Sequence, residues 1–209
     1  MSSRGRQRAA LAELRQGNIP HFLRNLKPVR LSQTLVSGEM ATAIIWVMPD
    51  YLAIGSDEDF LRIPLAYPSA TAFAKEFGFV LPTKKMVDAI YEQSAFHLNP
   101  QPMPPGPQMR SNRYFLKHQQ KIEAQRTQCP LGELISGHKK DVVLTNLLRS
   151  KPDRIAIYGW HRQNGEPIQP LSIVHGAWYA DYSHGIRLVS DQVWINGEML
   201  PILDVLNNP

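Results

Sequence analysis

Two Asn-Gly pairs in the last third of the chain constrain its fold more than any other feature. Asn164–Gly165 follows an apolar segment that ends at His161, and Asn196–Gly197 separates the apolar segments 193–195 and 199–200. Asn-Gly is the preferred pair in two-residue type I′ turns, because both central residues of that turn need a positive φ. Each pair therefore predicts a β-hairpin, and the back half of the chain should contain antiparallel sheet.

Apolar runs in the front half predict further strands. Residues 43–47 form a continuous apolar run, and shorter apolar runs at 51–54 and 60–63 each follow turn-forming residues. Runs of this length, bounded by such turns, are typical of strands. We expect the three runs to form a three-stranded meander.

Helices are expected mainly in the middle of the chain. Ser69 and Thr83 are suitable N-cap residues, and apolar residues at helical spacing follow each of them. Residues 111–128 predict an amphipathic surface helix, and residues 6–16 a short peripheral one. The expected fold class is α+β: mainly antiparallel sheet with meanders and Asn-Gly hairpins, and helices grouped in the middle of the chain.

A proline-rich stretch lies between the two halves. Residues 99–108 contain five prolines, and each proline fixes φ and removes a backbone donor, so extended backbone is expected. We expect a single domain over 1–209. A division into two subdomains, about 1–98 and 109–209, joined by this strap, is the alternative.

Composition narrows the class of protein. Hydrophobic residues make up 43% and charged residues 20% of the chain, which is typical of a soluble globular protein. No apolar run approaches the roughly 20 residues of a transmembrane helix, and the basic N-terminus lacks the apolar segment of a signal peptide. We therefore expect a cytoplasmic protein, or an exported one whose signal peptide lies outside this sequence, with no membrane partner.

Charge and cysteine content exclude further classes. The net charge of +5 is spread along the chain, and no nucleic-acid-binding motif accompanies it. A single cysteine, Cys129, rules out an internal disulfide. The expected partner is a small-molecule, glycan or peptide ligand and not a nucleic acid, while the oligomeric state stays open.

Polar groups suited to catalysis gather between Leu171 and Ser190. Histidine can transfer protons near neutral pH, and aspartate can orient it. With one histidine from the preceding hairpin, the candidate catalytic residues are His161, His175, Asp181, Ser183 and His184. The candidate substrate-binding residues are Tyr158, Trp178, Tyr182, Arg187 and Lys140.

The backbone path decides whether these residues cooperate. In one regular strand, His175 and Asp181 would share a face but lie about 20 Å apart, at roughly 3.3 Å per residue. The same strand would bury His184 on its apolar face. A bend at Gly176, at Gly185 or within 180–183 would instead bring Asp181, Ser183 and His184 together.

Three kinds of chemistry fit these residues. In the first, Ser183 is a nucleophile activated by a histidine that Asp181 orients, although no G-x-S-x-G elbow surrounds it. In the second, His175, Asp181 and His184 bind a divalent metal such as zinc, with His161 or His138 as a further ligand. The run HGAWYAD is similar to the H-x-x-G-x-A-x-D motif of D-alanyl-D-alanine-type metallopeptidases but is one residue shorter. In the third, Cys129 is the nucleophile, with His161 or His175 as its base.

A fourth interpretation needs no catalysis. The same aspartate, serine and histidines could hydrogen-bond one another and hold strand ends together, beside an aromatic surface that binds carbohydrate or peptide. We expect a hydrolase acting on an ester, amide or glycan-linked substrate, without a required cofactor. The alternative is a non-catalytic carbohydrate- or peptide-binding module.

Overall fold

The computed structural model describes residues 2–34 and 38–207, and within them the fold is α+β, as predicted. Strands pair mainly antiparallel. Three of the α-helices lie in the middle of the chain and two at its ends. The helices are α1 (Ser3–Arg15), α2 (Tyr67–Glu76), α3 (Lys84–Gln93), α4 (Asn112–Glu123) and α5 (Ile202–Asn207).

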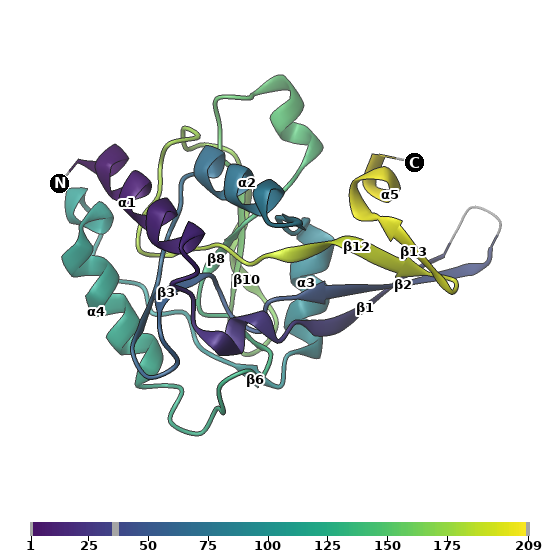
Figure 1. Ribbon diagram of the computed structural model, residues 1–209, viewed down its shortest axis with the longest axis horizontal. Coiled ribbons are helices and arrows are strands. Elements are labelled where there is room, and N and C mark those ends of the chain that lie inside the picture. Colours follow the sequence, from purple (N-terminus) through teal and green to yellow (C-terminus); the bar gives the residue numbers. More distant parts are fainter. Residues whose placement is uncertain (1, 35–37, 208–209) are drawn as a thin grey trace.

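A five-stranded antiparallel sheet joins the two ends of the chain. Its order is β1–β2–β12–β13, and β5 also pairs with β12. The strands are β1 (Lys27–Thr34), β2 (Met40–Val47), β5 (Phe79–Val80), β12 (Val189–Ile195) and β13 (Glu198–Pro201). Figure 1 shows the β1–β2 and β12–β13 pairs extending together away from α1 and α4.

The expected three-stranded meander is wrong. β3 (Ala53–Gly55) and β4 (Phe60–Arg62) pair with each other, but β2 pairs with β1 and β12 instead. Inward residues of β1, β2 and β12 pack with Met86 and Ile90 of α3 in one apolar core. A continuous apolar run indicates a buried strand, but it does not identify the neighbouring strand.

A second, four-stranded sheet carries four of the ten candidate site residues: Lys140, Tyr158, His161 and His184. Its order is β10–β9–β8–β11, with β8 and β11 parallel and the other pairs antiparallel. The strands are β8 (Lys140–Val142), β9 (Ile157–His161), β10 (Pro167–Ser172) and β11 (His184–Gly185). β6 (Phe96–His97) and β7 (Ile135–Ser136) form a separate parallel pair.

Both predicted hairpins form, but with different turns. At Asn196–Gly197 both residues have positive φ, so the β12–β13 turn has the expected type I′ signature. In the β9–β10 loop only Gly165 has positive φ, and its N–H donates to the Arg162 carbonyl. This is the longer loop in which a turn precedes a left-handed glycine, and the type I′ prediction for it is wrong.

The helix starts were predicted in part. Thr83 caps α3, since its hydroxyl accepts the Met86 N–H. Ser69 does not cap α2, which begins two residues earlier with Ala66 as N-cap and Pro68 in its first turn. In the described part of the chain, no helix is long and apolar enough to cross a bilayer.

The proline-rich stretch packs on the back half, and its last two residues, Pro107 and Gln108, begin the 3₁₀ helix η2 (Pro107–Arg110) instead of being extended. No helix or strand forms between Leu98 and Gly106. Met103 is buried with Phe115, Trp160 and Tyr182, and its N–H donates to the Tyr182 hydroxyl at 2.8 Å. The stretch thereby covers one side of the candidate site.

Candidate functional site

The chain bends twice between β10 and β11, so the single regular strand does not form. β10 ends at Ser172, and Gly176 then makes an isolated bridge with Arg154. The Tyr179 N–H donates to the Gly176 carbonyl, and the His184 N–H donates to the Asp181 carbonyl. These turns allow Asp181, Ser183 and His184 to lie together.

Asp181 is the centre of this turn. Its Oδ1 accepts the N–H and the hydroxyl of Ser183 at 2.8 and 2.7 Å, and its Oδ2 accepts the Tyr179 hydroxyl at 2.9 Å. Burial opposes the charge of Asp181, but His184 and these donors hold the pKa of its carboxyl below the usual value. Asp181 is therefore a fixed, ionised carboxylate.

His184 lies beside this carboxylate and is almost completely buried. Its Nε2 is 4.0 Å from Asp181 Oδ2, too far for a hydrogen bond, and the side chain is 1% exposed. Neither ring nitrogen has a hydrogen-bond partner among the described residues. Burial lowers the pKa of His184 to about 4, against the opposing effect of Asp181, so its imidazole is neutral at pH 7.

His175 brings the cluster to the surface. Its ring stacks on Tyr179 with the centroids 4.2 Å apart, and its centroid is 6.5 Å from that of His184. Partial burial and the charge of Lys140 lower the pKa of His175, while Asp181 raises it. We call these five residues the Asp181 group: His175, Tyr179, Asp181, Ser183 and His184.

Lys140 places a cation next to the Asp181 group. It pairs with His184 across β8 and β11, and its Nζ lies 4.9 Å from the centre of the Trp160 ring. Burial lowers the pKa of Lys140, and Asp181 opposes that effect. Trp160 has an unusual φ of 57° immediately after Gly159, so the backbone of β9 is strained at this point.

His161 and Tyr158 belong to a different cluster, around Asp88 of α3. The Tyr158 hydroxyl donates to Asp88 Oδ1 at 2.6 Å, and His161 Nε2 is 3.5 Å from the same oxygen. The His161 ring also stacks on Tyr91 at 4.6 Å. The contacts of these two predicted site residues are thus with α3 rather than with the Asp181 group.

The remaining candidate binding residues divide by exposure. Trp178 is 49% exposed, and the Arg4 guanidinium lies 5.5 Å from its ring centre. Tyr182 and Arg187 are buried: Arg187 donates to the Met48 and Ile135 carbonyls, and the Tyr182 carbonyl accepts Lys139 Nζ at 2.6 Å. These polar groups are therefore engaged inside the protein, except Arg187 Nε, which has no hydrogen-bond partner among the described residues.

A buried polar network contains three residues that the sequence did not indicate, Asp50, Tyr51 and Arg62. Asp50 bonds to Arg62 and to His138 Nε2, and Tyr51 donates its hydroxyl to Asp141 Oδ2 at 2.9 Å. Pro49–Asp50 has the composition of an ordinary turn, and Asp88 that of a solvated helix position. Arg62, inside the short apolar segment 60–63, was the one sequence feature that could have indicated this network, because an isolated charge there needs a buried partner.

The described residues contain no group of three or more histidine, cysteine, aspartate or glutamate side chains arranged to hold a metal ion. Cys129 is partly exposed, and burial raises the pKa of its thiol, so the thiolate is disfavoured.

No protein-family model, curated protein or solved structure matches this chain.

Proposed function

We propose that the protein is a hydrolase that uses the Asp181 group for acid–base catalysis on an ester, amide or glycan-linked substrate. The observation that carries this proposal is an ionised Asp181, fixed by three donors, beside two histidines: the partly exposed His175 and a buried His184 whose ring nitrogens are unpaired among the described residues. An unpaired buried polar group destabilises a fold by about 1–3 kcal/mol. Functional sites are where such a cost is expected.

In this proposal His175 is the general base. It is the histidine of the group with partial exposure, and its lowered pKa keeps it neutral and able to accept a proton at pH 7. It would take a proton from a water molecule as that water attacks the substrate carbon, and return it to the leaving group. Asp181 would stabilise the imidazolium, and Lys140 the negative charge that develops on the substrate.

Ser183 has a positioning role here. Its hydroxyl donates to Asp181 Oδ1, and the residue is 0% exposed. A nucleophilic serine must instead reach both its base and the substrate. Water is therefore the better-supported nucleophile.

The test is turnover of p-nitrophenyl esters, p-nitroanilides and p-nitrophenyl glycosides. We expect one of these classes to be hydrolysed, and His175→Gln and Asp181→Asn each to lower kcat/KM by at least ~100-fold. His21→Gln is the matched control, since His21 is exposed and is distant in sequence from the Asp181 group. This variant should retain full activity. Equal turnover by wild type and His175→Gln, on every class, would refute the proposal.

Two aromatic rings beside arginines, the exposed Trp178 and the half-buried Tyr179, favour the binding module as a second candidate. Arg4 lies over Trp178, and Arg110 lies 5.4 Å from the ring centre of Tyr179. Such surfaces suit sugar rings or peptide side chains. For a binder, Trp178→Ala should weaken the affinity for soluble glycan fragments or peptides in a fluorescence titration, whereas Asp181→Asn should not.

A further inference from the structure

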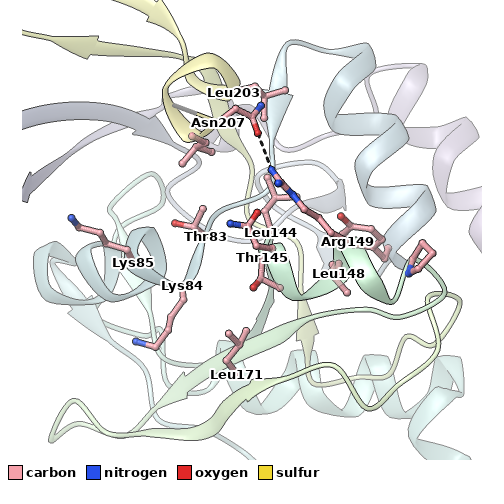
Figure 2. Close-up of a pocket in the computed structure, with 14 residues that line it drawn as sticks. Thr83, Lys84, Lys85, Leu144, Thr145, Leu148, Arg149, Leu171, Leu203 and Asn207 are labelled. Atoms are coloured by element: carbon pink, nitrogen blue, oxygen red, sulfur yellow. Dashed lines mark hydrogen bonds between the residues drawn. The ribbon is translucent and has the colours of Figure 1, made fainter. Parts of the chain in front are cut away.

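A pocket of about 630 Å³ lies away from the Asp181 group, between α3, α5, β10 and the 3₁₀ helix η3 (Asn146–Ser150). In Figure 2, Leu203 and Asn207 of α5 lie on one side of this pocket and Leu171 of β10 on the other. Its volume is within the usual range for small-molecule sites. None of the residues that line it belongs to the Asp181 group.

The polar part of the lining is cationic. Lys84, Lys85 and Arg149 line the pocket, and no aspartate or glutamate does. Lys84 is paired with Asp88 at 2.7 Å. The hydrogen-bond partners of the other two are neutral: Lys85 donates to Gln33 Oε1 at 2.8 Å, and Arg149 donates to Asn207 Oδ1 at 3.4 Å.

Neutral amide partners leave most of the positive charge uncompensated. An anion would therefore gain charge-assisted hydrogen bonds from Lys85 or from Arg149, and these bonds are stronger than the bonds to the amide oxygens that they would replace. The long, weak bond between Arg149 and Asn207 is the one most readily exchanged. The charge of the pocket thus favours an anionic ligand.

The rest of the lining is aliphatic. Leu144, Leu148 and Leu171 form part of the wall, and α5 adds Leu203 and Leu206, which are 49% and 40% exposed. Exposed leucines beside a concave surface gain stability when a hydrocarbon group covers them. A ligand that satisfies both parts of the lining has an acidic group at one end and an apolar body.

We propose that this pocket binds a small amphipathic anion, with a carboxylate or phosphate group at one of its cationic side chains, Lys85 or Arg149, and a hydrocarbon body against the leucines of η3, β10 and α5. The site is separate from the proposed catalytic site and does not depend on hydrolase activity. It borders the candidate residue Tyr158, since Lys84 Nζ lies 4.6 Å from the centre of the Tyr158 ring and Leu148 belongs to the same apolar cluster as Tyr158.

Decanoate is a suitable probe, followed by isothermal titration calorimetry and by amide chemical shifts. We expect one decanoate per chain, shift changes at Leu148 and Leu203, and at least tenfold weaker binding of decanol, which has the same body without the charge. The Lys85→Gln/Arg149→Gln variant should lose at least tenfold in affinity for decanoate. Both side chains are exposed, so the variant should fold normally.

The matched control is Arg113→Gln/Lys117→Gln, which removes the same charges from exposed positions on α4. It should bind decanoate like the wild type. Equal affinity for decanol and decanoate, or equal loss in both double variants, would overturn the proposal. Sedimentation of the protein with phosphatidylglycerol vesicles, without binding of free decanoate, would also overturn it by indicating a membrane surface as the ligand.

Discussion

Asp181 owes its position to groups from its own turn, above all to Ser183. The Ser183 hydroxyl donates to the carboxylate at 2.7 Å, and both residues are buried. We predict that Ser183→Ala lowers the free energy of unfolding by about 1–3 kcal/mol, because it removes a hydrogen bond to a buried charged group. Urea denaturation at pH 7 measures this loss.

Ser150→Ala is the control for this substitution. The Ser150 hydroxyl also donates a local hydrogen bond, to the Leu147 carbonyl at 3.4 Å, but this residue is exposed. Its replacement should change the free energy of unfolding by less than about 0.5 kcal/mol. Equal effects of the two substitutions would contradict a special role for the hydroxyl at Asp181.

Contacts between site residues that are neighbours in sequence could be predicted, and contacts between residues far apart in sequence could not. Asp181, Ser183 and His184 are neighbours in sequence, and an aspartate that accepts the N–H two residues later is a common turn device. The pairing of His161 with Asp88 joins a strand to a helix about seventy positions earlier. Neither residue carries a local pattern that identifies the other.

β11 requires glycine at position 185 because of a close approach by Tyr51. A Cβ there would lie 2.5 Å from Cδ1 of Tyr51 and 2.8 Å from the Lys139 Cβ. We predict that Gly185→Ala destabilises the fold by about 1–3 kcal/mol or more, since the ring and the strand would have to move. Thermal and urea unfolding at pH 7 measure the effect.

Gly176→Ala is the matched control at the other bend. A Cβ added at Gly176 would meet the Asp153 carbonyl oxygen first, at 3.9 Å, which is an ordinary contact. The φ of Gly176 is not in the left-handed region. We expect a change within about 0.5 kcal/mol. Similar losses of unfolding free energy at both glycines would show that the close approach of Tyr51 does not cause the destabilisation by Gly185→Ala.

Strand existence was easier to predict than strand partnership. The Asn196–Gly197 hairpin follows from local turn chemistry, and it forms as expected. The partner of β2 on one side is β12, about 150 positions later, and on the other side β1, which was not predicted. β1 does alternate Val29 and Leu31 with polar residues, but Pro28 weakens that strand signal.

The whole molecule contains an unusual number of buried ionisable groups, and these should make its stability depend on pH. Burial lowers the pKa of both His138 and His184 to about 4, and that of His118 further still. Each histidine is neutral in the folded protein at pH values where the unfolded chain, with a pKa near ~6.5, already binds a proton. Their stabilising effect is therefore complete above about pH 6.5 and is lost as the pH falls toward 4.

Asp141 acts in the opposite direction. Burial raises the pKa of its carboxyl to about 6, although Arg187 and Tyr51 oppose the shift, so its contribution is present at low pH and is lost as the pH rises through 6. The three deeply buried histidines, together with His161 and His175, whose pKa values burial also lowers, outweigh this one carboxyl, so acidification gives a net loss of stability. We predict that the free energy of unfolding falls by on the order of a few kcal/mol between pH 6.5 and 4, measured by urea denaturation.

His118→Leu tests which groups cause this fall. Neither ring nitrogen of His118 has a hydrogen-bond partner among the described residues, and the side chain is fully buried. Leucine removes an unsatisfied polar group, so the variant should be at least as stable as the wild type at pH 7 and should lose less stability on acidification. His21→Leu, at an exposed position, should leave the pH dependence unchanged. If His118→Leu loses as much stability on acidification as the wild type, the fall in stability comes from other groups. His118 would then bind as many protons in the folded protein as in the unfolded chain.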